Sequence, residues 1–170
     1  GKPVLSEKSL TTTMAQATAL VDGVTSAKTF FVEGLMYLAH PFLARFVEVL
    51  KDGRLGDLKA INGFYSADIW KVTNPAGRGT LYNLGCYPTS LMHLVIQTMC
   101  DEAAFGARRI RGTGNVSEQD GTVVDAAVSV RFDNGVLGTL QSTDRCGMAY
   151  GFNVSGMHGV LRFVTNPWLP

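Results

Sequence analysis

The sequence has no long hydrophobic run and no excess of charge of either sign, and each absence excludes a class of protein. No apolar stretch approaches the roughly 18 residues that a membrane-spanning helix needs. The first residues show no basic segment followed by an apolar one, so no signal peptide is visible. Lys and Arg number 15 against 14 Asp and Glu. The sequence therefore predicts a protein that binds neither a membrane nor a nucleic acid.

Cysteine is scarce, and the three that occur are unevenly spaced and form no CxxC pair: Cys86, Cys100 and Cys146. This pattern predicts neither a disulfide framework nor a zinc site, and it is typical of a reducing, cytoplasmic location. The histidines are also few and far apart. We expect His40 to cap a helix and His93 to pack within one, and we expect no metal site.

A complete glycine-rich phosphate loop is missing as well. Gly112-Thr113-Gly114 could begin a GxGxxG pattern, but Ser117 stands where the third glycine is required. Residues 118–121 indicate a turn, whereas a pyrophosphate site needs a helix N-terminus behind the glycines. The sequence predicts that these residues alone cannot hold a nucleotide pyrophosphate.

The composition that is present is globular, with 46% hydrophobic and 17% charged residues. Both ends of the chain fall inside structured patterns, so we expect a fragment of a longer protein. Residues 3–7 indicate a strand. Residues 11–22 indicate a helix that a threonine cluster caps and that Gly23 ends, and residues 29–37 a second strand. This order is typical of a parallel α/β unit.

The rest of the chain predicts an α+β layout. A helix begins at His40-Pro41 and ends by Gly53, and a second helix covers residues 85–99. The strands are expected at 59–67, 108–112, 123–132, 136–143 and 152–164, with a loop over 69–78. Asp133-Asn134-Gly135 predicts a hairpin turn. We therefore expect one open, mostly antiparallel sheet with helices on one face.

Lys8 is a candidate functional residue because it follows a strand in the parallel unit. Ligands of open α/β sheets bind beyond the carboxyl ends of strands, and an ammonium there can donate hydrogen bonds to an alcohol or alkoxide oxygen. A surface pair between Lys8 and the adjacent Glu7 explains the same residues, and the spacing alone does not separate the two readings.

Asn83 and Tyr87 are four residues apart, so both face one way if helical geometry begins by Asn83. A tyrosine can pass a proton to a carbonyl oxygen, and a nearby ammonium favours its ionised form. The alternative is a tyrosine that merely packs at the start of a helix.

Three segments in register resemble the glucose-fructose oxidoreductase and inositol dehydrogenase (Gfo/Idh/MocA) family over nearly the whole chain. They are residues 1–9 (GKPVLSEKS), residues 33–41 with 51–58 (EGLMYLAHP and KDGRLGDL), and residues 79–88 (GTLYNLGCYP). Tyr87 stands where histidine is usual, which points to the branch containing dihydrodiol dehydrogenase and glucose-fructose oxidoreductase.

The resemblance implies a two-domain oxidoreductase that uses NAD or NADP. Residues 1–38 would be the C-terminal remnant of a Rossmann domain, and residues 39–170 most of a substrate-binding α+β domain that also pairs subunits. Lys8 would be the catalytic lysine and Tyr87 the proton donor or acceptor. Asn83 would contact the substrate, a sugar, polyol or diol, and Glu7 with Lys8 would contact the cofactor. The fragment alone should be inactive.

The departures from the family pattern leave an alternative open. Ser9 replaces a proline, Leu38 an arginine, and Asn83 an aspartate, and an asparagine cannot take up a proton. A non-catalytic relative that senses a ligand or regulates another protein would keep the fold and tolerate this change. Lys8 and Tyr87 favour the enzyme.

The expected sheet also predicts self-association, as a homodimer or a larger oligomer. Val124, Ala126, Val128 and Val130 share one face. Val123, Ala127 and Phe132 would leave the other face partly apolar, and a monomer seldom exposes an apolar patch of more than several hundred Å².

Overall fold

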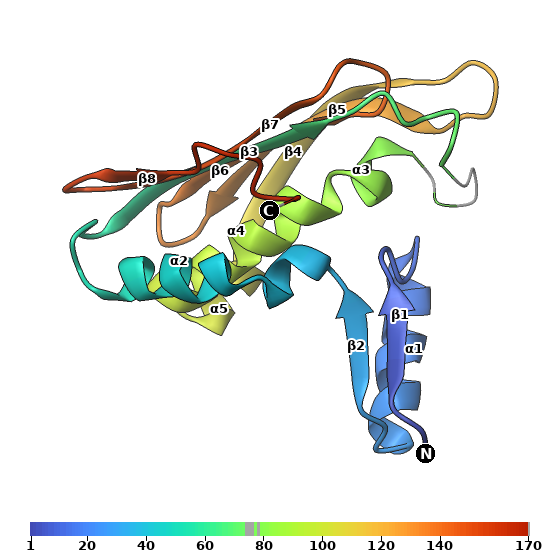
Figure 1. Cartoon of the computed structure of the whole chain (residues 1–170), viewed down its shortest axis with the longest axis horizontal. Coiled ribbons are helices and arrows are strands. Elements are labelled where there is room, and N and C mark those ends of the chain that lie inside the picture. The colour runs from blue at the N-terminus through green and yellow to red at the C-terminus, as the bar shows by residue number, and fades with distance from the viewer. Residues whose placement is uncertain (74–76, 78, 170) are drawn as a thin grey trace.

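The chain forms two sheets of unequal size, one with two strands and one with six (Figure 1). The computed structural model describes residues 1–73, 77 and 79–169. In the small sheet, β1 (Val4–Glu7) and β2 (Phe31–Gly34) are parallel and α1 (Met14–Ser26) connects them. The parallel strand-helix-strand unit predicted for the first residues is confirmed.

The large sheet has the strand order β4-β5-β6-β3-β7-β8 and is open at both edges. Its strands are β3 (Leu58–Ser66), β4 (Arg108–Val116), β5 (Val123–Phe132), β6 (Leu137–Thr143), β7 (Ala149–Gly156) and β8 (Val160–Arg162). All neighbours are antiparallel except β3 and β6, which run parallel. The expected open, mostly antiparallel sheet is confirmed, although its centre is a parallel pair.

Helices cover one face of this sheet (Figure 1). They are η1 (Met36–Ala39), α2 (Pro41–Lys51), α3 (Thr80–Asn83), α4 (Cys86–Met99) and α5 (Glu102–Gly106). The apolar stripe of α2 buries Leu43, Phe46 and Leu50. Pro41 occupies its first turn, where a missing N–H costs nothing. The described helices include none that is long and apolar enough to cross a membrane.

The alternation of side chains along β5 shows which of its residues point towards the helices and which point to the open face of the sheet. Val124, Ala126, Val130 and Phe132 are all buried on the side of the helices. Phe132 was expected on the opposite face, and this is wrong, because residues an even number apart along a strand point the same way. The open face is consequently more polar than the sequence analysis assumed.

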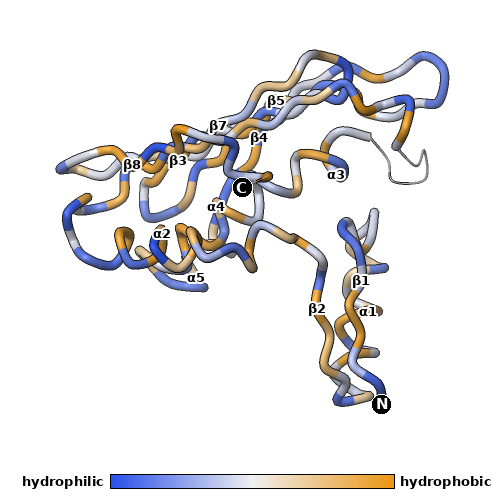
Figure 2. Tube along the Cα trace, viewed as in Figure 1, coloured by the Kyte–Doolittle hydropathy of each residue, from blue (hydrophilic) through white to orange (hydrophobic). Residues whose placement is uncertain are grey.

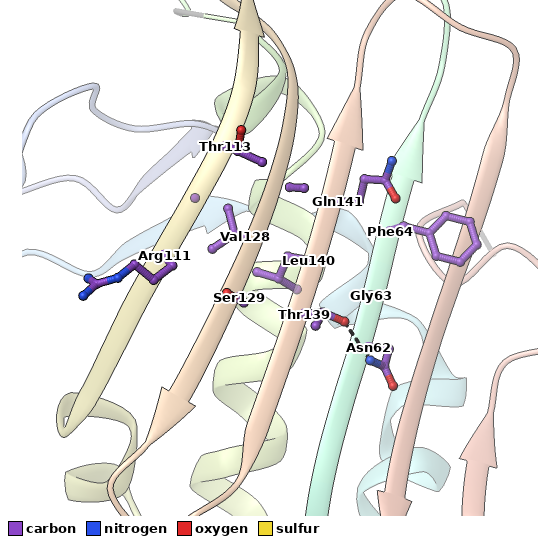
Figure 3. Close-up of a pocket in the computed structure, with 12 residues that line it drawn as sticks. Asn62, Gly63, Phe64, Arg111, Thr113, Val128, Ser129, Thr139, Leu140 and Gln141 are labelled. Carbon is purple, nitrogen blue, oxygen red and sulfur yellow. Dashed lines mark hydrogen bonds between the residues drawn. The ribbon is translucent and has the colours of Figure 1, made fainter.

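The open face carries a shallow groove over β4, β5, β6 and β3 (Figure 3). Its lining mixes polar and apolar residues, and Asn62 Nδ2 donates a hydrogen bond of 2.7 Å to Thr139 Oγ1 across the parallel pair. Two larger apolar side chains on this face are exposed, Phe64 by 38% and Leu137 by 52%.

Two of the predicted boundaries in the parallel unit are wrong. The helix expected to end at Gly23 continues to Ser26, and Lys28 rather than Gly23 adopts the left-handed conformation (φ 47) that follows it. The expected strand over 29–37 ends at Gly34, because the chain turns there into η1. Thr13 caps α1 as expected, since its side chain accepts a hydrogen bond from the Gln16 N–H.

The large sheet shows further differences. The expected strand over 152–164 is two strands, because a hydrogen bond from Gly156 N to Gly159 O closes a tight turn. β4 extends to Val116, so the candidate Gly112-Thr113-Gly114 lies inside a strand. The hairpin at residues 133–135 is confirmed, with a positive φ only at Gly135 (90°). The expected loop over 69–78 lies partly outside the described residues.

The strand-helix-strand unit has little core of its own. No residue of α1 is buried, and Leu5 is 76% and Phe30 69% exposed. Hydrophobic residues, coloured orange in Figure 2, are prominent along β2. Such a concentration of exposed apolar side chains on a small unit indicates a surface that another part of a protein covers.

Candidate active site

The carboxyl ends of β1 and β2 meet the helices that cover the large sheet, and Lys8 lies at this junction. Lys8 Nζ donates a hydrogen bond of 2.6 Å to the main-chain oxygen of Asn83. Ser9 Oγ donates one of 2.6 Å to the main-chain oxygen of Tyr82, and Tyr82 Oη returns one of 2.9 Å to Thr12 O. These three bonds attach the segment after β1 to α3, so Lys8 is not a simple surface partner of Glu7.

Gly79 allows α3 to begin at this place. Its φ is +86°, and a Cβ there would come within 2.2 Å of the Val123 carbonyl oxygen. Only glycine adopts this conformation at no steric cost. The glycine therefore brings the start of α3 against β5, and α3 presents Asn83 to Lys8.

Tyr87 lies beside Lys8, in the first turn of α4. Lys8 Nζ is 5.3 Å from the centroid of the Tyr87 ring, which is a cation–π distance. The structure thus brings together the three residues that the sequence singled out, Lys8, Asn83 and Tyr87.

The Tyr87 side chain is packed among aromatic rings and is only 4% exposed. Its ring centroid lies 5.5 Å from that of Tyr65, 6.0 Å from that of Tyr37 and 6.1 Å from that of Trp168. Its hydroxyl donates to Met36 Sδ at 3.4 Å. A thioether is a weak acceptor, so this hydroxyl has no strong partner within the described residues.

The pKa of Tyr87 is raised from 10.0 to about 12, mainly by burial, with smaller contributions from the nearby acidic groups of Cys86, Tyr65 and Glu7. The sequence analysis expected the Lys8 ammonium to favour the ionised form, and this direction is wrong. The ammonium lies over the ring face, while the hydroxyl is in an apolar pocket that penalises a phenolate. Tyr87 therefore holds its proton at neutral pH.

The sequence analysis considered that Asn83 and Tyr87 would face the same way if helical geometry began by Asn83. The two residues do not lie on one continuous helix. α3 ends at Asn83, Leu84 and Gly85 form a break, and α4 begins at Cys86. Both residues still contact Lys8, because the break keeps α3 and α4 adjacent. The Asn83 Nδ2 atom is buried and has no hydrogen-bond partner among the described residues.

Glu7 is the last residue of β1 and is exposed. Its charge is close enough to contribute to the raised pKa of Tyr87. Cys86, beside Tyr87, is half-buried, and burial raises the pKa of its thiol despite the nearby Lys8. Burial therefore favours the neutral thiol of Cys86.

Trp168 is a site residue that the sequence analysis missed. It is fully buried against Tyr37, Tyr65 and Tyr87, and its Nε1 donates to the Phe64 main-chain oxygen at 3.3 Å. The sequence analysis interpreted this end of the chain as a break inside a structured pattern and gave Trp168 no role. The signal available was the tryptophan itself, because a residue that buries so much apolar surface rarely lies in an unpacked tail.

The remaining candidate chemistry lies elsewhere or is structural. His40 caps α2, with Nδ1 accepting from the Phe42 N–H at 3.2 Å, as predicted. His93 stacks on Phe105 and contacts Glu102 at 3.0 Å. In the described part of the chain, no three histidine, cysteine or acidic side chains gather in a way that could hold a metal ion.

Comparison with known proteins gives consistent results. The model of the GFO/IDH/MocA C-terminal domain matches residues 43–162. Trans-1,2-dihydrobenzene-1,2-diol dehydrogenase of Bos taurus is 25% identical over 176 residues, covering 100% of this chain and 50% of the relative. An uncharacterized oxidoreductase of Rhizobium meliloti is 31% identical over 100 residues, 56% of this chain and 30% of the relative. The chain spans about half the length of the curated relatives it matches.

Solved structures share the fold. The 3-ketoreductase KijD10 of Actinomadura kijaniata, in complex with TDP-benzene and NADP, superposes with a TM-score of 0.81 at 21% identity, covering 99% of this chain and 49% of that one. A levoglucosan dehydrogenase in complex with NADH and L-sorbose superposes with a TM-score of 0.77 at 18% identity, covering 96% and 48%. With the family model matching 43–162, this chain belongs to the Gfo/Idh/MocA family and contains its C-terminal domain.

Proposed function

We propose that the protein containing this chain is an NAD(P)-dependent oxidoreductase that interconverts a secondary alcohol of a sugar, polyol or diol with the corresponding carbonyl. The observation that carries the proposal is the meeting of Lys8, Asn83 and Tyr87 at the carboxyl ends of β1 and β2. The proposal is supported by the sequence similarity to a trans-1,2-dihydrobenzene-1,2-diol dehydrogenase and by the fold shared with a 3-ketoreductase solved with NADP and a levoglucosan dehydrogenase solved with NADH and L-sorbose.

The residues present fit the reactive end of a nicotinamide cofactor and not its pyrophosphate. Lys8 and the buried Asn83 Nδ2 provide hydrogen-bond donors where ligands of parallel sheets bind. Glu7, directly before Lys8, is the last residue of β1. The GxG segment at residues 112–114 lies in a strand with no helix behind it. When bound, the cofactor supplies or accepts the hydride. We infer that the 170-residue chain alone binds neither NADH nor NADPH with micromolar affinity and is inactive.

Tyr87 is proposed as the group that exchanges a proton with the substrate oxygen. Its raised pKa keeps the proton on the phenol, which suits donation to a carbonyl during reduction. Its hydroxyl now contacts Met36 Sδ, and Met36 is 51% exposed. A substrate oxygen is a better acceptor than a thioether, so a substrate that displaces the Met36 side chain would gain this hydrogen bond.

Lys8 is proposed to stabilise negative charge on the substrate oxygen. Its ammonium has donors besides the one that binds the Asn83 carbonyl. Positive charge beside a developing alkoxide lowers the barrier to hydride transfer from the alcohol.

The domain division is proposed to fall near residue 38. The parallel β1-α1-β2 unit has the strand-helix-strand order of a Rossmann domain, and its apolar residues are largely exposed. Burial of that surface by the rest of such a domain would account for it. Residues 39–170 would then be the substrate-binding domain.

A non-catalytic relative is the second candidate, and specific observations favour it. Asn83 cannot accept a proton where the family pattern has aspartate, and the Tyr87 hydroxyl is buried with a raised pKa. Such a protein would bind a cofactor or a sugar without turnover. Saturable binding of substrate and NAD(P)H with no hydride transfer would identify it.

Pairing of subunits through the open sheet face completes the proposal. Helices leave that face uncovered (Figure 1), and Phe64 and Leu137 are exposed among polar side chains. Two open sheets stacked face to face would bury both. A reducing, cytoplasmic location is proposed from the three free thiols.

The experiment is a hydride-transfer assay on the full-length protein with NAD and NADP against a panel of sugars, polyols and aromatic dihydrodiols. Turnover of at least one alcohol, reduced about 100-fold in a Lys8→Ala variant, is the expected result. Lys59→Ala, a change to an exposed lysine far from the site, serves as the matched control. Absence of turnover across the panel with intact cofactor binding would favour the non-catalytic alternative.

A further inference from the structure

A second cavity, separate from the Lys8–Tyr87 site, lies between the helices and one edge of the large sheet. It has a volume of about 170 Å³ and is lined by residues of α3, α4, α5 and strands β4, β5 and β6, with a partly open rim at Leu81 and Ile110, which are 40% and 49% exposed. Its walls come largely from apolar side chains, among them Met92, Phe105, Val130, Phe132 and Leu140. Nothing in the proposed reaction uses this space.

The cavity and the candidate active site lie on different sides of α4. Gly85, Thr89 and Met92 line the cavity, and these residues follow one another at helical spacing on one face. Tyr87 points instead into the aromatic cluster with Tyr37 and Trp168. A ligand in the cavity would therefore not compete with one at Tyr87.

One polar group in the wall is unsatisfied. Ser142 lines the cavity and is 3% exposed, and its buried Oγ has no hydrogen-bond partner among the described residues. A buried hydroxyl without a partner is costly, so such groups in native proteins are usually paired. Thr89, the other hydroxyl in the wall, already donates to the Gly85 carbonyl at 2.7 Å.

The size and chemistry of the cavity together indicate what it takes. An apolar cavity of about 150 Å³ is large enough for a benzene ring and stays dry when empty. An ordered water needs two to four polar partners. Arg108, at the edge of the wall, already donates to the Phe105 carbonyl, so Ser142 is the one hydroxyl in the described wall without a partner. A small ring with a single polar substituent satisfies both the apolar wall and Ser142.

We propose that this cavity is a binding site for a small aromatic alcohol of phenol size, whose hydroxyl pairs with Ser142 Oγ. The proposal goes beyond the oxidoreductase function and does not depend on it. The ring occupies the space beside Met92 and Phe132, and the hydroxyl supplies the partner that Ser142 lacks.

The test uses NMR of the 170-residue chain labelled with ¹³C at the methionine methyl groups, titrated with phenol and with its isostere toluene. The chain has six methionines, and of these only Met92, which is 2% exposed, lines the cavity. Saturable shifts of the Met92 methyl, with the other five nearly unmoved, are expected for both probes. Equal shifts at exposed Met14 and Met157 would mean non-specific partitioning and would overturn the site.

Two variants separate the role of the hydroxyl from that of the cavity. Ser142→Ala should weaken phenol binding about five-fold, the effect of one hydrogen bond, and leave toluene binding unchanged. Ala126→Leu, which fills the cavity, should abolish binding of both, and Val128→Phe provides a second filling variant if the first does not fold. If Ser142→Ala affects the two probes equally, the hydroxyl pairing is wrong. If neither probe shifts Met92 in the unmodified chain, the site itself is wrong.

Discussion

The ammonium of Lys8 lies over the ring of Tyr87, 5.3 Å from its centroid, whereas the Tyr87 hydroxyl contacts Met36. The two groups that the proposed reaction joins are therefore adjacent, but they do not share a hydrogen bond. A substrate oxygen between Lys8 Nζ and Tyr87 Oη would connect them. Because the two groups are not hydrogen-bonded to each other, we expect substitutions of Lys8 and of Tyr87 to have separate effects on the reaction.

Removal of the Tyr87 hydroxyl should affect catalysis more than binding. In the full-length protein, Tyr87→Phe is expected to lower kcat by about 100-fold, the scale of a general acid or base, while KM changes little. Steady-state kinetics on the best substrate measures both. The control is Tyr65→Phe, which removes a hydroxyl from the same aromatic cluster. Near-normal turnover in Tyr87→Phe would refute the proton-transfer assignment.

Asn83 should matter less, because its Lys8 contact uses the main chain. Asn83→Ala removes only the buried Nδ2 donor, so we expect a loss of less than about 10-fold in kcat/KM, the effect of one hydrogen bond. Asn83→Asp restores the proton acceptor of the family pattern. The two variants are compared by kcat/KM as a function of pH. A loss in Asn83→Ala as large as that in Lys8→Ala would assign the side chain a direct role.

Alkaline pH should destabilise the fold through Tyr87. Its pKa is raised from 10.0 to about 12 in the folded chain, so the folded state binds the proton more tightly than the unfolded state. The resulting stability is fully present below pH 10 and is lost as the pH rises from 10 towards 12. Burial raises the pKa of Tyr37 in the same direction.

Urea unfolding between pH 8 and 11.5 measures this dependence. Tyr87→Phe should show a smaller decline in the free energy of unfolding above pH 10 than the unmodified chain. Tyr150→Phe, at a tyrosine that is 38% exposed, serves as the control. Equal declines in all three proteins would show that Tyr87 titrates normally.

Trp168 should be a major source of stability. Trp168→Ala removes a fully buried indole from among four aromatic neighbours, Tyr37, Tyr65, Tyr87 and Phe152. A loss of about 3–5 kcal/mol in the free energy of unfolding is expected. Urea unfolding followed by circular dichroism measures it, with Trp70→Ala, a half-buried tryptophan outside this cluster, as the control. A loss below about 1 kcal/mol would show that the C-terminal residues do not pack as described.

Self-association should depend on the open sheet face. Light scattering is expected to give about twice the 18.3 kDa mass of one chain. Thr139→Arg places a charge in the middle of that face and should return the chain to a monomer, whereas Thr165→Arg, at an exposed position outside the strands, should not. A monomeric mass for the unmodified chain at micromolar concentrations contradicts the pairing.

Sequence reasoning located the elements well where local signals decide them. His40, Pro41 and the apolar spacing of α2 define one helix by short-range chemistry, and the Asn134-Gly135 turn defines one hairpin. The three candidate residues Lys8, Asn83 and Tyr87 also meet in space. Local patterns were sufficient for the helix and the hairpin because each depends on neighbours a few residues away. The meeting of Lys8 with Asn83, 75 positions apart, was instead predicted from the family resemblance.

The features that were missed depend on distant contacts. The raised pKa of Tyr87 follows from rings contributed by Tyr37, Tyr65 and Trp168, which lie in three separate segments of the chain. The parallel pairing of β3 with β6 has no local signal either. The start of α3 requires Gly79 to approach Val123, which the sequence around Gly79 does not reveal.

The parallel pair at the centre of the sheet has a consequence for how the chain folds. Asn62 and Thr139, which are hydrogen-bonded across β3 and β6, are 77 positions apart, and the other neighbour of β3, β7, follows later still. During synthesis β3 therefore emerges with both of its edges unpaired, while β4, β5 and β6 can form a meander by themselves. Non-local pairing of this kind slows folding to the range of milliseconds to seconds. The strand that lies deepest in the finished sheet is thus among the last to be protected from aggregation.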